Sequence, residues 1–170
     1  VWHNHGDAMD VAFLAMAYKG GFLIDDINNS VEHILDVPYE SEKRYSAKIY
    51  KDKKSDQIKI AVKGSVARVL DFCSKIGTID NPFEIDKNKI KKEGEFLASQ
   101  GYRVLAVAYG IINSQDFNID KFSDKKIKDL NFLSLVCFID PLRKDSKDAV
   151  EKCKKAGIKV VMITGDHPAT

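Results

Sequence analysis

The sequence predicts a protein of the α+β class, and three observations predict it. Residues 58–63 alternate apolar and polar side chains with the period of a half-buried strand. Gly64 then breaks the strand, and Ser65 begins a helical pattern that we expect to end near Gly77. Residues 45–50 form a second strand pattern, which pairs with the first as a hairpin across the polar loop 51–56.

The composition is that of an ordinary globular protein. The 170 residues suit one sizeable domain, or one domain and part of another, and 44 % of them are hydrophobic. The apolar runs are shorter than a membrane span, and the chain begins abruptly, as an excised piece would. The net charge of +2 reflects 27 basic and 25 acidic residues that alternate, which argues against a nucleic-acid partner.

Cysteine and histidine give no pattern of metal ligands. The four histidines share no ligand spacing, so we expect no metal site. The three cysteines lie far apart in apolar sequence, and we interpret them as buried thiols of a cytosolic protein: Cys73, Cys137 and Cys153.

The N-terminal part predicts a helix followed by a strand. Asp7 caps a helix whose side chains are nearly all apolar and which ends at Gly20 and Gly21, so the helix should be buried on most sides. Asp10 follows the cap by three residues, where its carboxylate can accept a hydrogen bond from the cap's own N–H. Residues 31–37 form a strand that Pro38 blocks.

The second half of the chain predicts two further strand and helix pairs. A helix runs from Asp86 to Gly101, and the strand 103–109 follows. The segment 116–128 is interpreted as a loop or a loosely attached helix, and 133–139 as an apolar strand. Asp145 then opens a helix that Gly157 ends, and the unbroken apolar run 158–163 predicts a strand buried on both faces of a parallel sheet.

Lys63 lies where an anion site could form. Its side chain emerges opposite the apolar row of its strand, close to the helix that follows Ser65. Backbone N–H groups and the helix dipole favour an anion there, so a phosphate is a plausible ligand. The alternative is a solvated lysine at a strand end.

Six segments of the chain, in order, resemble signatures of the P-type cation-transporting ATPases, in particular of their calcium-pump and sodium-pump branch. Each motif is short, so their shared order and spacing carry the resemblance. The segments are GDAMD at 6–10, VPYESEKR at 37–44, KGS at 63–65, RVLA at 103–106, DPLR at 140–143 and VMITGDHPAT at 161–170.

The resemblance implies two domains. Residues 1–139 would be the nucleotide-binding (N) domain, a twisted antiparallel sheet flanked by helices. Residues 140–170 would be a hinge, formed by Asp140, Pro141 and Arg143, and the start of a haloacid-dehalogenase-like phosphorylation (P) domain. The phosphorylated aspartate would lie outside this chain, so we expect no catalytic residue here, and binding of ATP or ADP without hydrolysis.

The resemblance also implies the setting of the domain. The parent would be a membrane pump that uses ATP with Mg²⁺ to drive cation transport, with this soluble domain in the cytoplasm. Its partners would be the remaining P, actuator and transmembrane domains. Two other functions stay open: a phosphohydrolase of the haloacid-dehalogenase type, against which the missing aspartyl nucleophile counts, and a non-catalytic adenine-nucleotide-binding module.

The same resemblance assigns nucleotide-binding residues position by position. On the adenine side, Tyr39 matches the aromatic that stacks on the base, Asp10 a carboxylate that hydrogen-bonds it, and Leu105 a residue that lines the base site. The further assigned positions include the pocket lysine, two arginines and the segment that meets the terminal phosphate and its Mg²⁺: Ser41, Arg44, Lys63, Gly64, Arg103, Thr164, Gly165 and Asp166.

Several of these positions depart from the family pattern. Tyr39 replaces phenylalanine, Asp10 is one methylene shorter than glutamate, and Ser41 stands where calcium pumps often carry arginine. Residues 65–67 read SVA in place of APE. These departures predict weakened nucleotide affinity, since a lost arginine removes a charge-assisted hydrogen bond. Outside the resemblance, Tyr39 could be a core or turn residue and Arg103 an edge-strand ion-pair partner.

Overall fold

Seven strands form one sheet in the computed structural model, which describes residues 7–113, 117–119, 122–139 and 143–163. The strand order is β1-β2-β3-β6-β7-β4-β5. Neighbours pair antiparallel except β4 and β7, which are parallel, so the expected antiparallel sheet is in fact mixed. The strands are β1 (Val31–Val37), β2 (Tyr45–Asp52), β3 (Ile58–Gly64), β4 (Cys73–Gly77), β5 (Pro82–Glu84), β6 (Arg103–Ile112) and β7 (Leu130–Phe138).

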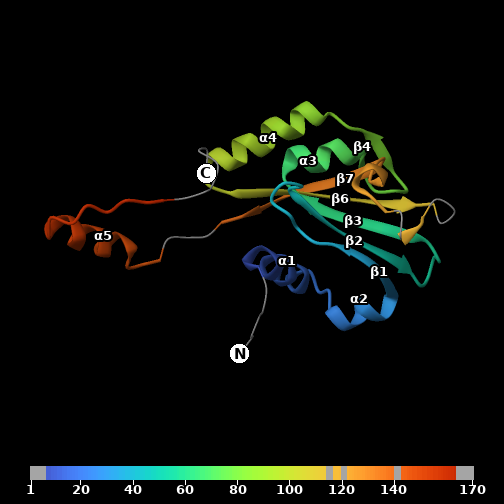
Figure 1. Cartoon of the computed structure of the whole chain (residues 1–170), viewed down its shortest axis with the longest axis horizontal. Helices are drawn as coiled ribbons and strands as arrows, with labels where there is room; N and C mark the ends of the chain where they lie inside the picture. Colours follow the sequence, from blue (N-terminus) through green and yellow to red (C-terminus); the bar gives the residue numbers. More distant parts are fainter. Residues whose placement is uncertain (1–6, 114–116, 120–121, 140–142, 164–170) are drawn as a thin grey trace.

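Helices lie on both sides of this sheet (Figure 1). Helices α3 (Val66–Phe72) and α4 (Lys87–Ser99) cover one face, and α1 (Ala8–Lys19) and α2 (Ile24–Ser30) lie on the other side. Helix α5 (Ser146–Lys155) stands apart from the sheet. This arrangement confirms the predicted α+β class and gives the sheet two different faces.

The hairpin predicted from residues 45–63 is confirmed. Strands β2 and β3 pair antiparallel from Lys51 opposite Ile58 to Tyr45 opposite Gly64. Ile60 and Val62 are buried, as the period-two pattern predicts. Strand β3 continues the sheet into β6, where Val62 lies opposite Ala108. The strand next to the hairpin in the sheet is therefore β6, which begins about 40 residues after β3 in the sequence.

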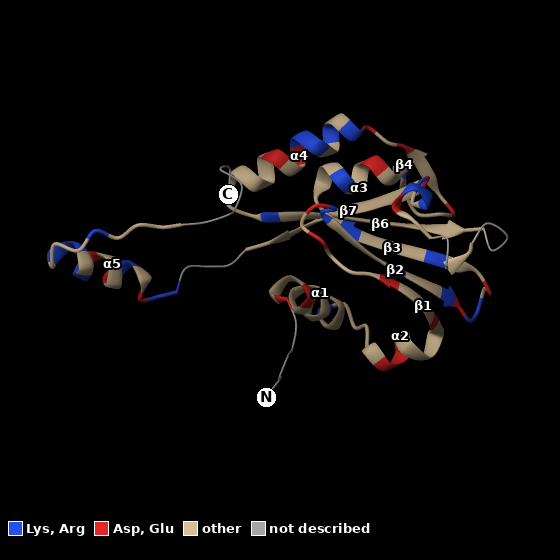
Figure 2. Cartoon of the chain, in the orientation of Figure 1, with Lys and Arg blue, Asp and Glu red and all other residues tan. Residues whose placement is uncertain are grey.

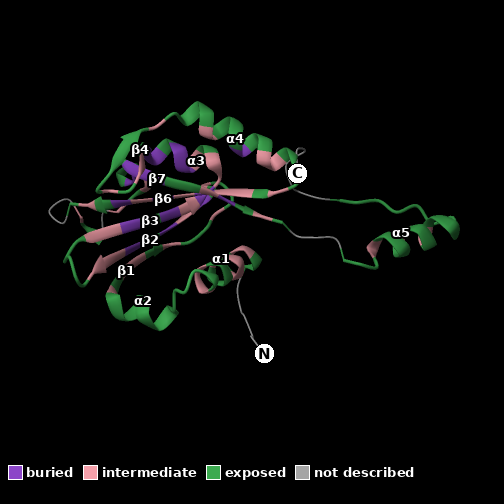
Figure 3. Ribbon diagram, turned by 180° about the vertical axis from the view of Figure 1, so that it is seen from behind, coloured by how far each residue is buried: buried purple, intermediate pink, exposed green. Residues whose placement is uncertain are grey.

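The core lies between the sheet and α3 (Figure 3). Its largest fully buried side chains are Tyr45, Ile49, Ile60 and Val69. The Tyr45 ring packs edge-on against Phe72 of α3, with 5.0 Å between ring centroids. We call this side of the sheet the α3 face, and it consists of Tyr45, Ala47, Ile49, Ile60, Val62, Ala106 and Ala108.

The helix after Ser65 is shorter than predicted. It ends at Phe72, and residues 73–77 form β4 beside β7 instead of continuing to Gly77. Cys73 has an extended backbone, and its thiol donates a hydrogen bond to the Val69 carbonyl. Pairing with β7 supplies the ladder hydrogen bonds that a longer helix would have made internally, so tertiary structure overrides the local pattern.

The first helix is correctly placed, but its predicted burial is wrong. Asp7 caps α1 by accepting a hydrogen bond from the Met9 N–H at 2.7 Å, and Gly20 and Gly21 end the helix. None of the α1 residues, all of which are described, is buried. The sheet contacts only one side of the helix, so apolar side chains such as Leu14 remain exposed on the other side.

Residues 158–163 do not form the predicted strand. This described segment is extended without ladder pairing, and its apolar side chains are exposed: Ile158, Val160, Val161, Met162 and Ile163. No described strand lies beside it in the sheet order, so its backbone has no neighbour with which to form a ladder. The preceding helix is correct, since Asp145 is the N-cap of α5 and Gly157 follows its end.

Two smaller expectations also change. The described part of the segment before β7 is mostly loop, as one alternative predicts, and contains a short 3₁₀-helix, η2 (Asp124–Lys126). Buried Ile127 attaches it to the core, so the alternative of a loosely attached helix is wrong. Of the three thiols, Cys73 is buried, Cys153 is partly buried and Cys137 is exposed. No helix in the described part of the chain is long and apolar enough to cross a membrane.

Candidate functional site

The face of the sheet opposite α3 carries three of the predicted site residues. Lys63 of β3 lies opposite Val107 of β6, and on β6 the side chains of residues 103, 105 and 107 share one face. In the β6–β7 pair, Leu105 lies opposite Val136 and Arg103 opposite Phe138. We call this side the α1 face, and its members used here are Lys63, Arg103, Leu105, Val107, Val136 and Phe138.

Two cations therefore lie at the same end of the two central strands. Basic parts of β3 and β6 appear at this end in Figure 2. Lys63 and Arg103 are separated by four register positions, which is about 13 Å along the strands. Strand β6 lies between β3 and β7, but its register with β3 ends at Ala106. Among the described strands Arg103 therefore has a neighbour only in β7, and the alternative of an edge-strand ion-pair partner stays open.

The Lys63 ammonium is held between two residues of α1. Its Nζ forms an ion pair with the Asp10 carboxylate and lies 4.9 Å from the centroid of the Phe13 ring. Asp10 thus binds Lys63, where a hydrogen bond back to the Asp7 cap was predicted. Partial burial lowers the pKa of Lys63, and the carboxylate of Asp7 opposes this shift.

The predicted anion site beside the α3 N-terminus is not formed. Helices α3 and α1 lie on opposite sides of the sheet (Figure 1). The Lys63 ammonium contacts Phe13 of α1, whereas α3 packs on the α3 face. Ser65 occupies the N-cap position, but its Oγ is buried without a hydrogen-bond partner among the described residues. Lys63 and the helix N-terminus are adjacent in sequence and separated by the sheet in space.

Gly64 has a structural reason to be glycine. A Cβ atom built there would lie 2.5 Å from the Arg44 carbonyl oxygen and 2.7 Å from Tyr45 Cα. The Ser65 N–H donates a hydrogen bond to that same carbonyl at 2.9 Å, and Arg44 has a φ of 57°. The backbone at Gly64, at the end of β3, thus lies directly against the backbone at Arg44 and Tyr45, at the start of β2.

The predicted residues of the β1–β2 connection lie at this same end of the sheet. Tyr39 follows β1 by two residues and the residue is 61 % exposed, so the alternative of a core residue is wrong. Ser41 and Arg44 are also exposed. The turn between them is closed by the Arg44 N–H, which donates to the Glu40 carbonyl at 2.8 Å. The structure thus brings Tyr39, Arg44 and Lys63 to one end of the hairpin.

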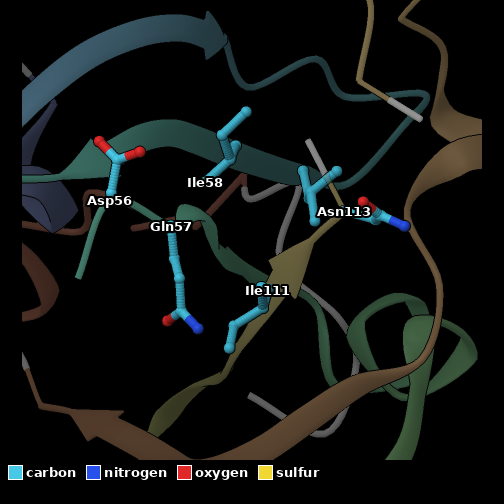
Figure 4. A pocket seen from close by; sticks show the side chains of 6 residues that line it. Asp56, Gln57, Ile58, Ile111 and Asn113 are labelled. Atoms are coloured by element: carbon cyan, nitrogen blue, oxygen red, sulfur yellow. The ribbon is translucent and has the colours of Figure 1, made fainter. Parts of the chain in front are cut away.

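One pocket lined by described residues lies away from the predicted site. It is a hollow of about 210 Å³ at the opposite end of β3 and β6, lined by Asp56, Gln57, Ile58, Ile111, Ile112 and Asn113 (Figure 4). Ile58 precedes Lys63 by five residues of strand, which is about 17 Å. The pocket and the predicted site are therefore separate.

Several predicted residues fall outside the described ranges. These are Asp140 and Pro141 of the expected hinge, and Thr164, Gly165 and Asp166 of the expected phosphate segment. Arg143 is described and exposed, and its carbonyl accepts a hydrogen bond from Ser146 at the start of α5. No group of three or more potential metal-ligating side chains occurs within the described ranges.

Two aromatic residues of the site were not predicted. Phe13 contacts both Lys63 and Phe138, and its ring centroid lies 5.1 Å from that of Phe138. The sequence pattern identifies Phe13 only as an apolar residue of the first helix and Phe138 only as an apolar residue of the strand 133–139. A signal was available, because Phe13 follows Asp10 by three residues and the two must share a helix face.

Comparison with known proteins identifies the family. A family model described as "P-type ATPase, cytoplasmic domain N" matches residues 1–145. The chain therefore belongs to the P-type cation-transporting ATPases, as the six motifs predict.

Curated relatives agree with this assignment. The chain is 35 % identical to "Sodium/potassium exporting P-type ATPase cta3" of Schizosaccharomyces pombe over 99 % of its length. It is 36 % identical to "Cation-transporting ATPase pma1" of Synechocystis over 99 %, and 32 % identical to "Calcium-transporting ATPase 1" of Bacillus cereus over 97 %. The matched region covers 16 % to 18 % of these relatives, so the chain spans under a fifth of their length.

Proposed function

We propose that this chain is the ATP-binding domain of a cation pump and presents ATP for phosphorylation of an aspartate outside the chain. The observation that supports this most directly is the convergence of Lys63, Leu105 and Arg103 on the α1 face, in a chain that matches domain N. Residues from β3 and β6, far apart in sequence, meet there beside Asp10 of α1.

The chemistry of the α1 face suits a nucleotide. Lys63 and Arg103 are cations about 13 Å apart along the strands, so they would contact different parts of one elongated anionic ligand. Leu105 lies between them in register and offers an apolar surface to a base. At the hairpin end, Tyr39 presents an exposed ring for stacking, with Arg44 close by. We assign the base to the side of Tyr39, Asp10 and Leu105, and the phosphates to Lys63 and Arg103.

The terminal phosphate and Mg²⁺ would meet Thr164, Gly165 and Asp166 when the domains of the whole pump close. Mg²⁺ would neutralise charge on the phosphates. The remaining P, actuator and transmembrane domains would be the partners, with the pump in a membrane and this domain in the cytoplasm. Without an aspartyl nucleophile in place, the chain alone should not turn over ATP.

Base stacking is tested with Tyr39→Ala and a matched control. Phe83 is an aromatic of nearly equal exposure, 60 % against 61 %, on the distant strand β5. Stacking is worth roughly 1 to 3 kcal/mol, so Tyr39→Ala should weaken ATP, ADP and AMP alike by about 5- to 150-fold in titration calorimetry. Phe83→Ala should leave all three affinities unchanged. Equal affinities for Tyr39→Ala and the parent chain, with the fold intact, would overturn the assignment of Tyr39.

Hydrolysis is tested separately. A phosphate-release assay with ATP and Mg²⁺ should give no turnover above the protein-free control. Turnover that scales with protein concentration would contradict the proposal and support a phosphohydrolase instead.

A further inference from the structure

We propose that Phe13 is a positioning residue of the nucleotide site, which holds the Lys63 ammonium in place through its ring face. The proposal rests on the proposed function, because it gives the positioned ammonium a ligand to bind. It adds to that site an aromatic residue of α1 and a residue of β7.

The geometry of the three residues points to this role. The Lys63 Nζ lies 4.9 Å from the Phe13 ring centroid, within the distance at which a cation is attracted to a ring face. The Phe13 ring in turn meets the Phe138 ring at 5.1 Å with 66° between their planes, an edge-to-face contact. Phe138 thus holds Phe13, and Phe13 contacts the ammonium.

Lys63 needs such support because its other described partner is weak. The side chain of Lys63 is 32 % exposed and that of Asp10 59 % exposed, and ion pairs of this kind contribute little. A lysine also carries its charge on a flexible four-carbon stem. The ring and the carboxylate, both on one face of α1, restrict the ammonium from two sides.

The same contact connects the two cations of the α1 face. Phe138 is the last residue of β7 and lies opposite Arg103 in the β6–β7 pair. Phe13 therefore contacts both Lys63 of β3 and Phe138, the residue opposite Arg103. A nucleotide that engages both cations would therefore lie beside the Phe13 and Phe138 rings.

The proposal is tested with an aromatic series at Phe13 and two readouts. We expect Phe13→Leu to weaken ATP binding by about two- to fivefold, which corresponds to the usual strength of an exposed cation–π contact. It should also lower the pKa of the Lys63 ammonium, measured by NMR of the labelled lysine side chain, because the ring favours the charged form. Phe13→Trp should retain both the affinity and the pKa.

A control variant and a double-mutant cycle of Phe13 and Lys63 distinguish a positioning role of Phe13 from a packing role. Phe22→Leu changes an exposed phenylalanine just after α1 and should alter neither readout. In a Lys63→Ala background, Phe13→Leu should have no further effect on ATP affinity. An equal loss in both backgrounds would assign Phe13 to packing alone and overturn the proposal.

The outcomes also distinguish this proposal from the proposed function. If the parent chain binds ATP and Phe13→Leu changes neither affinity nor the Lys63 pKa, the role of Phe13 is wrong and the proposed function stands. If the parent chain binds no ATP, the proposed function fails, and the pKa series alone then decides whether Phe13 holds Lys63. If Phe13→Leu does not fold, the pKa of the Lys63 ammonium in Phe13→Trp decides. A Lys63 pKa in Phe13→Trp below that in the parent chain would contradict the proposal.

Discussion

The two faces of the sheet differ in what their side chains do. On the α3 face, Ile60 and Val62 of β3 are buried in the same hydrophobic core as Val69 of α3. On the α1 face, Lys63 of the same strand binds a carboxylate and an aromatic ring while remaining one-third exposed. Adjacent residues of one strand thus face the core on one side and the proposed nucleotide site on the other. Substitutions one position apart in β3 should therefore change different measured properties.

The largest effect is expected for a core residue of the α3 face. Ile60→Ala removes a fully buried side chain and should lower the free energy of unfolding by about 2 to 5 kcal/mol in urea denaturation. ATP affinity should stay unchanged in conditions where the variant is folded. A folded Ile60→Ala chain with strongly weakened ATP binding would contradict the separation of the two faces.

Gly64→Ala should affect both properties, because Gly64 lies where β3 meets Arg44. The added Cβ would clash with the Arg44 carbonyl and Tyr45 Cα, and relieving such a clash costs about 1 to 3 kcal/mol. We expect a lower thermal midpoint and weaker ATP binding, since the connection that carries Tyr39 must shift. Unchanged stability would show that the two backbones separate at no cost.

Lys63→Ala should weaken binding with little change in stability. Because Lys63 is assigned to the phosphates, ATP and ADP should lose more affinity than AMP. The loss of one charge-assisted hydrogen bond should weaken ATP binding by about tenfold. This loss should shrink as the salt concentration rises. Lys75→Ala, which changes an exposed lysine of the distant strand β4, is the matched control and should bind ATP normally. Identical losses for both lysines would indicate general charge attraction in place of a defined site.

The smallest effect concerns pH at the far end of the hairpin. The side-chain contact with Lys59, helped by the N–H groups of Ser55 and Lys54, lowers the pKa of Asp52 from 3.8 to about 2. A carboxyl whose folded pKa is depressed stabilises the fold above its unfolded pKa, and this contribution is lost as pH falls from about 4 to 2. Asp52→Asn should flatten the decline of the thermal midpoint in that window and leave ATP affinity at neutral pH unchanged. A decline as steep as that of the parent chain would assign the acid sensitivity to other groups.

Local patterns predicted the hairpin and β1, because the alternation of apolar and polar side chains in a strand involves only consecutive residues. The bounds of β1 are those predicted, and β2 and β3 extend the predicted strands by one or two residues. Helix α2 and strand β5 were not predicted, since they are short and have no clear apolar period.

Apolarity alone misled in two places. The sequence of α1 and the run 158–163 are both strongly apolar, yet neither is buried in the structure. Apolar composition indicates that a segment favours a packing partner, and it does not indicate that the partner is present in the same chain. Burial therefore could not be derived from these residues by themselves.

The site shows the same limit for contacts between distant residues. Asp10 and Lys63 are 53 positions apart, so no local pattern joins them, and only the family motifs assigned both to one site. Local reasoning instead offered an anion site at the adjacent α3 N-terminus, with a solvated lysine as the alternative, and the sheet separates Lys63 from that helix. Phe13 was missed because a phenylalanine in an apolar helix is most simply a packing residue.

The central claim is that the α1 face binds ATP, and chemical-shift mapping of the isotope-labelled chain tests it most directly. With ATP in the millimolar range, which suits a small ligand with few anchored atoms, we expect shifts at Tyr39, Lys63, Leu105 and Arg103. Ile60 and Ala106 on the α3 face should shift little. Shifts confined to the pocket around Asp56 and Asn113, or no shifts at any of the four residues, would contradict the account.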